Sequence, residues 1–177
     1  MRPALLLESD EARVVIDCGP DFRQQMLRTE VKGIDAIVIT HEHNDHVIGI
    51  DDVRPFNFMQ QKDMPVYATR AVMKELENRF AYAFAAERYP GSPRIHLEAI
   101  DKNSRFQIGD LDFRPIEVMH GKLPVLGFRI GDFAYLTDMK TIAAQEASKL
   151  AGVGTLVVNA LHHTPHHSHL SLNEALE

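Results

Sequence analysis

The sequence has no tryptophan, only one cysteine, and no excess of positive charge. The single cysteine, Cys18, excludes an intrachain disulfide and is typical of a chain kept in a reducing cytoplasm. The net charge of −6 and the absence of a basic run argue against broad electrostatic binding to nucleic acid or to an anionic membrane. No apolar stretch reaches the length of a membrane span, and the first residues turn acidic too early for a signal peptide. We therefore expect a cytoplasmic protein without membrane segments.

The composition is that of an ordinary globular chain, with 177 residues of which 45% are hydrophobic and 25% charged. Short apolar runs predict strands at 5–7, 14–16, 34–40 and 64–68. The run 34–40 is almost continuously apolar, so both faces of that strand should be covered. Apolar residues at 72, 73, 76, 80 and 84 predict one face of a helix. The first half therefore indicates an α/β fold.

The second half is dominated by period-two patterns. Alternating apolar residues around Gly109 and Gly131 predict hairpins over 106–113 and 128–135. Residues 141–150 predict a helix that ends before Gly152, and 155–160 predicts a further strand. Ser171 and Glu174 have the spacing of a capping box, so a last helix begins there and meets the chain end.

Four polar residues crowd the end of the predicted strand 34–40, in the segment "HEHNDH". By the two-residue alternation, His41 and His43 should leave the strand on the same side, and Asp45 and His46 follow in a turn. They are either a solvated polar loop or metal ligands. Packing gains nothing from such a cluster, whereas imidazole and carboxylate are ligands that Zn²⁺, Mn²⁺ and Fe ions share. We favour the metal interpretation.

Two other predicted strands end in residues of the same kind. His120 follows Ile116–Met119, and Asp138 follows Tyr135–Thr137. Alone, each is weak evidence, because a strand-terminal aspartate is most often a turn or a helix cap. Together with "HEHNDH", three strand ends supply metal-type ligands.

The pattern H-x-H-x-D-H, a lone histidine and a strand-terminal aspartate resembles the metallo-β-lactamase superfamily over nearly the whole chain. The resemblance implies a four-layer αββα sandwich that holds two divalent ions, Zn²⁺ or alternatively Mn²⁺. It implies that His41, His43 and His120 bind the first ion, that Asp45 and His46 bind the second, and that Asp138 bridges the two.

The resemblance also assigns Asp17, in "VVIDCG", as a hydrogen-bonding support of the metal loop, although an ordinary strand-end turn is the alternative. Such folds usually open with a strand and a glycine-rich loop, and close with a strand carrying a last histidine ligand. Neither segment is found here. We therefore expect residues 1–177 to form a single domain truncated at both ends, with an incomplete second metal site.

Five histidines gather in "NALHHTPHHSHLS", at positions 162, 163, 166, 167 and 169. A solvated loop accounts for most of them individually. His169 is the candidate for contact with substrate, because it lies two residues before the expected helix cap, Ser171, and helix N-termini favour anions.

The segments "DCGPDFRQQML", "HNDHVIGIDDVRPFN" and "HSHLSLNEAL" resemble the superfamily branch of phosphoribosyl 1,2-cyclic phosphate phosphodiesterase. This resemblance implies a metal-dependent phosphodiesterase in which a metal-bridging hydroxide attacks phosphorus. It assigns His169 and Asp45 to catalysis. Arg54, Lys122 and His167 are candidates for substrate contacts, with ordinary surface charge as the alternative for Arg54 and Lys122.

Other functions remain open. The tRNA 3′-processing endonucleases share the metal motif, but no basic arm is found between His46 and His120. Thioester or lactam hydrolysis, and a metal-binding module without catalysis, are further alternatives. We expect a small phosphodiester as partner rather than a nucleic acid, and a homodimer is open.

Overall fold

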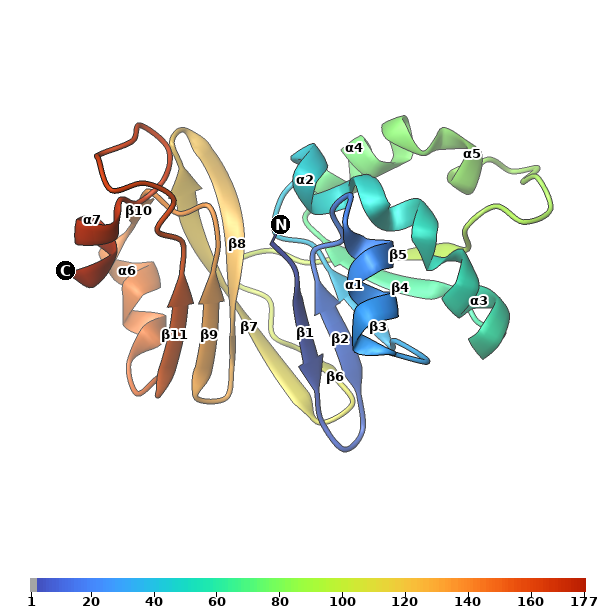
Figure 1. Ribbon diagram of the computed structural model, residues 1–177, viewed down its shortest axis with the longest axis horizontal. Helices are drawn as coiled ribbons and strands as arrows, with labels where there is room; N and C mark the ends of the chain where they lie inside the picture. Colours follow the sequence, from blue (N-terminus) through green and yellow to red (C-terminus); the bar gives the residue numbers. More distant parts are fainter. Residues whose placement is uncertain (1–2) are drawn as a thin grey trace. The chain divides into compact units, whose positions relative to one another are not determined.

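The computed structural model describes residues 3–177, which form two compact units, each with its own β-sheet (Figure 1). The first unit runs to Ile100 and includes Ile108–Asp110, and the second comprises Asp101–Gln107 and Leu111–Glu177. The expectation of a single domain stays a prediction. No helix in the described part of the chain is both long and apolar enough to cross a bilayer.

The sheet of the first unit contains five strands in sequential order. They are β1 (Leu5–Glu8), β2 (Arg13–Ile16), β3 (Ala36–Val38), β4 (Met64–Ala68) and β5 (Ile95–Ala99). β1 pairs antiparallel to β2, and the other neighbours pair in parallel. The apolar run 34–40 is confirmed as a strand only over Ala36–Val38, because the chain then leaves the sheet to form a loop.

Helices of the first unit pack their apolar residues against this sheet. They are α1 (Phe22–Thr29), α2 (Asn44–Val47), the 3-10 helix η1 (Ile48–Val53), α3 (Arg54–Gln60), α4 (Arg70–Arg79) and α5 (Ala81–Phe84). Phe22 of α1 and Leu76 of α4 belong to the same buried cluster as Val15 and Val66 of the sheet. Val38, on the opposite face of β3, is also buried, as expected for a strand covered on both sides.

The helical stripe predicted over residues 72–84 is interrupted. α4 begins with the side chain of Thr69 accepting a hydrogen bond from the Val72 N–H, and it ends at Arg79. Phe80 has φ −115° and ψ 38°, which are not helical values, so α5 is a separate short helix. Phe80 is nevertheless buried, because its side chain remains in the core of the first unit.

The second unit contains six strands and two short helices. The strands are β6 (Phe106–Ile108), β7 (Leu111–His120), β8 (Leu123–Ile130), β9 (Phe133–Leu136), β10 (Thr141–Ile142) and β11 (Thr155–Val158). Their order is β10-β7-β8-β9-β11, and β6 pairs with β7. β11 is parallel to β9, with Val158 beside Leu136, so the segments that follow the two strands leave the same edge of the sheet. The helices are α6 (Ala144–Ala147), continued by the 3-10 helix η2 (Ser148–Leu150), and α7 (Leu172–Leu176).

Local signals in the second half are mostly confirmed. Gly109 and Gly131 have φ of 58° and 62° in the two hairpin turns, which glycine adopts without steric cost. Ser171 and Glu174 form the capping box of α7. The helix expected over 141–150 is wrong at its start, because Thr141 and Ile142 pair with β7 as an edge strand. Pairing across the sheet therefore overrides helix propensity there.

Candidate metal centre

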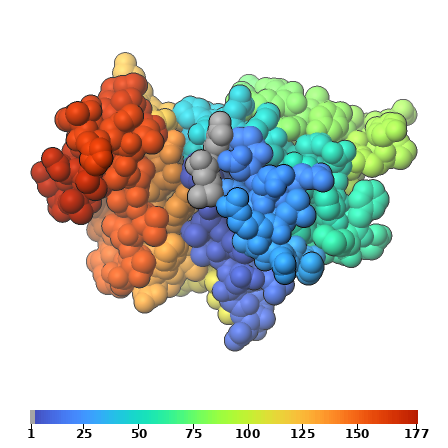
Figure 2. All heavy atoms as spheres, viewed as in Figure 1, coloured from blue at the N-terminus to red at the C-terminus, as the bar shows by residue number. Residues whose placement is uncertain are grey.

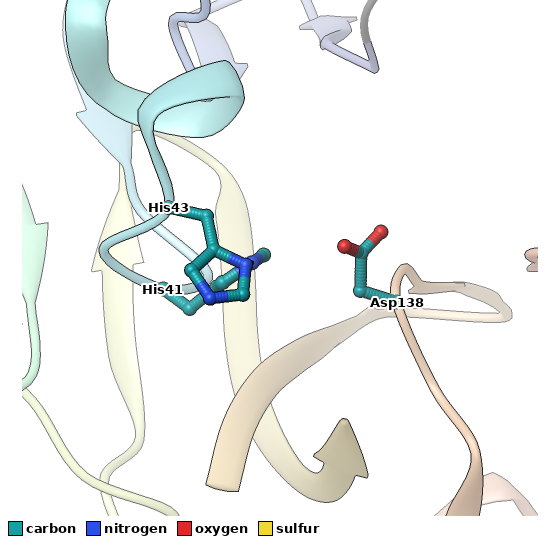
Figure 3. A group of neighbouring side chains, drawn as sticks. All are labelled: His41, His43 and Asp138. Atoms are coloured by element: carbon teal, nitrogen blue, oxygen red, sulfur yellow. The ribbon is translucent and has the colours of Figure 1, made fainter. Parts of the chain in front are cut away.

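His41 and His43 lie on the loop that follows β3 (Figure 3). Nε2 of His41 and Nδ1 of His43 are 3.0 Å apart, and the ring of His41 is also 4.1 Å from that of His46, measured between centroids. The side chains are adjacent as expected, but strand alternation is the wrong reason, since β3 already ends at Val38. The loop itself brings the rings together.

A buried hydrogen-bond network around Asp17 and Thr40 holds this loop in place. Asp17, which follows β2, is fully buried with φ 63°, and its carboxylate accepts hydrogen bonds from the Thr40 N–H at 2.9 Å and the Thr40 hydroxyl at 2.9 Å. The same carboxylate lies 2.7 Å from Nδ1 of His46. The Thr40 hydroxyl also lies 2.9 Å from Nδ1 of His41. Asp17 therefore orients two histidines by hydrogen bonds, one of them through Thr40.

Asp45 and His46 lie on α2 rather than in an irregular turn. His46 is fully buried, whereas the side chain of Asp45 is 52% exposed and its Oδ2 is 3.8 Å from Nε2 of His46. The backbone of α2 is tied to the segment after β2, because the Cys18 N–H donates to the His46 carbonyl at 2.8 Å. Helix α2 therefore holds one buried and one exposed candidate ligand side by side.

Arg79, at the end of α4, binds the same loop through hydrogen bonds. Its Nη1 donates to the backbone carbonyl of Glu42, which lies between His41 and His43, and to Oδ1 of Asn44 at 3.0 Å. Its Nη2 donates to Glu75 at 3.3 Å. The sequence contained no signal for this contact, because Arg79 is far from the motif along the chain.

The second unit carries its own group of candidate ligands. His120 ends β7, Asp138 follows β9 with φ 53°, and His169 lies on the segment before α7. Ligand atoms of the three side chains all lie within 4.8 Å of one another. Nδ1–H of His120 donates a hydrogen bond to the Ser168 carbonyl at 2.8 Å, and Nε2 of the same ring lies 4.0 Å from Oδ2 of Asp138.

His169 is the most enclosed histidine of the segment that follows β11. Its ring centroid is 4.5 Å from that of His120, and its Nδ1 is buried with no hydrogen-bond partner among residues 3–177. Burial lowers the pKa of His169, the Asp138 charge raises it, and His120 lowers it again, with a net downward shift. A buried ring nitrogen of this kind is suited to binding a metal ion or a substrate oxygen.

The other four histidines of this segment differ in exposure. His162, His163 and His167 are exposed, and the rings of His166 and His167 are 4.2 Å apart. Figure 2 shows the segment that contains them, coloured red, at the molecular surface. The structure therefore distinguishes His169 from the three exposed histidines, whereas the ring of the partly buried His166 lies 5.4 Å from that of His169, measured between centroids.

The two predicted substrate-binding cations have different surroundings. Arg54 begins α3 and forms an ion pair with Asp51 at 2.7 Å, so its charge is largely offset. Lys122 is exposed in the turn that joins β7 to β8, two residues after His120. Of the two, Lys122 is the one placed beside a candidate ligand.

Divalent ions fit the donors that are present. Zn²⁺ binds imidazole nitrogen at about 2.0–2.1 Å, so two ligand atoms on one ion lie roughly 3–3.5 Å apart. The 3.0 Å separation in the first unit and the 4.8 Å limit in the second require only small side-chain movements. Hydrogen-bond partners on Nδ1 of His41 and Nδ1 of His120 also match the usual support of metal-bound histidine.

Comparison with known proteins identifies the family of the chain. Residues 12–177 match the family model described as the β-lactamase superfamily domain. The chain is 40% identical over 178 residues to a protein named octanoyltransferase from Porphyromonas gingivalis, covering 99% of this chain and 36% of that protein. It is 30% identical to ribonuclease Z from Streptococcus agalactiae, over 78% of this chain and 45% of that protein. The chain thus spans less than half the length of these relatives.

Among solved structures, a diphosphatase of the PhnP family superposes with a TM-score of 0.90 and 35% identity, covering 99% of this chain and 66% of that one. Its similarity extends over both units, and the expected fold class is confirmed. The chain belongs to the metallo-β-lactamase superfamily, in its PhnP-like branch.

Proposed function

We propose that this chain is the catalytic part of a metal-dependent phosphodiesterase. Membership of a superfamily of metal-dependent hydrolases supports the reaction type. The observation that carries the proposal is the group of His120, Asp138 and His169, within 4.8 Å of one another, in a chain 35% identical to a diphosphatase. His169, whose Nδ1 has no hydrogen-bond partner among the described residues, lies beside two metal-type ligands, where it can serve as a proton donor, a role that metal storage does not require.

The proposed ligand assignment follows the superfamily motif. His41, His43 and His120 would hold one divalent ion, Asp45 and His46 a second, and Asp138 would contact both. When bound, such ions lower the pKa of water and neutralise charge on phosphate oxygens. Zn²⁺ is the proposed metal, with Mn²⁺ as the alternative, since both accept imidazole and carboxylate.

The remaining candidate residues would position the phosphate and protonate the leaving oxygen. His169 would donate a proton to the leaving oxygen, and an anionic phosphate beside it would favour its protonated form. Lys122, free of carboxylate partners among the described residues, would attract phosphate oxygens, and the exposed His167 would line the approach. Arg54 is a weaker candidate, because Asp51 already pairs with it.

Acyl transfer, suggested by the name of the Porphyromonas relative, has little support in this chain. A cysteine nucleophile must be accessible as the thiolate. Cys18 is fully buried, and burial, together with the charge of Asp17, raises the pKa of its thiol well above the usual value. The chain also covers only 36% of that relative, so the named activity can belong to the rest of that protein.

Cleavage of tRNA precursors is the second candidate, because the ribonuclease Z relative is 30% identical over 78% of the chain. The net charge of −6 disfavours it, since an RNA nuclease must neutralise many phosphates. A small phosphodiester or a diphosphate linkage therefore ranks first.

A substrate panel tests the proposal. Purified protein loaded with Zn²⁺ or Mn²⁺ should hydrolyse bis-nitrophenyl phosphate, a 2′,3′-cyclic nucleotide or a dinucleoside diphosphate faster than a phosphomonoester, a thioester or a β-lactam. His43→Ala should lose both bound metal and activity, whereas His163→Ala, an exposed histidine, should retain both. Faster turnover of a thioester, a lactam or a tRNA precursor than of every small diester would overturn the assignment.

A further inference from the structure

A cleft of about 680 Å³ lies in the second unit, and none of the candidate metal ligands lines it. Its charged lining consists of Lys102, Arg105, Arg114, Arg129, Lys149 and one carboxylate, Asp112. The volume is in the range of small-molecule sites, about 300–1,000 Å³. A concentration of five cations is unusual in a chain of net charge −6.

Three of these cations are already neutralised. Lys102 pairs with Glu117 at 2.7 Å, Arg105 with Asp112 at 2.6 Å, and Lys149 with Glu146 at 2.7 Å. Arg114 and Arg129 have no carboxylate partner within the part of the chain that the structure describes. The uncompensated charge of the cleft therefore resides in two arginines.

These two arginines are neighbours on adjacent strands, on the same face of the sheet. Arg114 of β7 and Arg129 of β8 are direct partners in the antiparallel register. Side chains at such positions have Cβ atoms about 4.5–5.5 Å apart, and like charges there destabilise the sheet. An anion bound between the two guanidinium groups would turn this repulsion into attraction.

Arg129 is oriented before any ligand arrives. Its Nε donates to the Gly131 carbonyl at 2.8 Å, and its Nη1 donates to the carbonyls of Lys149 and Ala151, both at 2.7 Å. Nη2 makes no hydrogen bond to the part of the chain that the structure describes, so one edge of the guanidinium is fixed while the Nη2 donors stay available to a ligand. Arg114 is exposed and can reach the same ligand.

We propose that this cleft is a binding site for a small phosphate-bearing anion, held between Arg114 and Arg129. Arginine donors match phosphate oxygens in a bidentate manner. A nucleic acid fits less well, because two uncompensated cations in a confined cleft cannot neutralise a run of phosphates. Arg114 is six residues before His120 on β7, so the cleft is roughly 20 Å from that ligand along the strand. It is a separate site from the metal centre.

Amide chemical shifts during titration with inorganic phosphate test the site in the full chain. Saturable shifts should appear at residues 102–105, 112–114 and 129–131. Arg114→Gln should weaken phosphate binding at these amides at least tenfold, whereas Arg28→Gln, which removes an exposed arginine from α1, should leave it unchanged. Without phosphate, Arg114→Gln should unfold at a temperature no lower than the unaltered chain, because it removes the repulsion with Arg129.

Arg114→Lys provides a second variant that keeps the charge but loses the planar fork, and it should bind with intermediate strength. The proposal fails if the shifts occur only around residues 41–46, 120 and 138, which would indicate phosphate at the metal centre. It also fails if binding does not saturate, or if Arg114→Gln and Arg28→Gln behave alike. The metal-dependent hydrolysis proposed above is tested separately by the substrate panel, so either proposal can fail alone.

Discussion

His169 and His163 belong to the same histidine-rich segment but have different surroundings. His169 lies beside His120 with a buried ring nitrogen, while His163 is exposed and makes no hydrogen bond or ring contact within residues 3–177. Only a side chain that is held in place can deliver a proton in the transition state. At the scale of single residues, enclosure therefore distinguishes a candidate catalyst from a solvated neighbour.

We predict that His169→Ala lowers kcat for an alkyl phosphodiester about 10²- to 10⁴-fold, the usual value of a positioned acid. The defect should be smaller for a nitrophenyl ester, because nitrophenolate needs little protonation. Metal content, measured by atomic absorption, should stay unchanged, and His163→Ala should have no effect. Loss of metal would instead make His169 a ligand, and an unchanged rate would make it part of a polar loop.

At the scale of elements, the metal loop is held by its neighbours more than by its own backbone. Asp17 after β2 supports it through Thr40 and His46, and Arg79 from α4 supports it through Glu42 and Asn44. Supporting hydrogen bonds of this kind typically change metal affinity by 10- to 100-fold when they are lost. The loop geometry is thus a property of three elements together.

We predict that Arg79→Met weakens metal binding about 10- to 100-fold, because the loop loses its donor to the Glu42 carbonyl. Calorimetric titration with Zn²⁺ measures the change. Arg70→Met, which removes an exposed arginine from the same helix, should bind metal normally. Equal affinity in both variants would show that Arg79 does not hold the loop.

Helix α7 depends on a different set of contacts. Glu174 accepts hydrogen bonds from the Ser171 N–H at 2.8 Å and from Nζ of Lys140 at 2.6 Å. The Lys140 bond, followed by the Ser171 bonds, lowers the pKa of Glu174 from 4.5 to about 2. Because the pKa is lower in the folded state, the ionised carboxylate stabilises α7 above about pH 4.5.

We predict that this stabilisation disappears as the pH falls from about 4.5 to about 2, when Glu174 becomes protonated in the folded state. Amide hydrogen exchange at α7 should quicken over this range relative to exchange in β8. Glu174→Gln should exchange faster than the unaltered chain at pH 6 and should lack the additional acid dependence. The same acid dependence in the variant would assign it to another group.

At the scale of the whole molecule, the candidate ligands are divided between two compact units. His41, His43, Asp45 and His46 lie in the first unit, and His120 and Asp138 lie in the second. If both groups bind metal in the folded state only, the ions contribute to overall stability by mass action.

We predict that removing metal with a chelator lowers the thermal unfolding midpoint. Free metal at 100 times its Kd contributes about 2.7 kcal/mol, which corresponds to roughly 5–10 °C for a domain of this size. Calorimetry with and without Zn²⁺ measures the difference, and His43→Ala should reduce it. A midpoint unaffected by chelation in metal-loaded protein would contradict the assignment.

Short-range features were readable from the sequence because neighbouring residues determine them. The glycine turns at 109 and 131 and the Ser171 capping box depend on local backbone geometry. The density of histidines in "HEHNDH" indicated metal ligands for the same reason, since four donors within six residues have no packing role. The sequence pattern did not predict α1. Phe22 and Met26 are its only buried residues, and two residues are too few to form a recognisable apolar helical face.

Long-range features required the tertiary structure. Thr141 and Ile142 became an edge strand because β7 offered hydrogen bonds that an isolated helix could not match. Arg79 reaches Glu42, and Arg114 faces Arg129, through pairings that no local pattern encodes. The sequence by itself determined which residues can bind metal, because that chemistry resides in the side chains. Only the fold decided which side chains hold them in place, because contacts distant along the chain form when helices and strands pack.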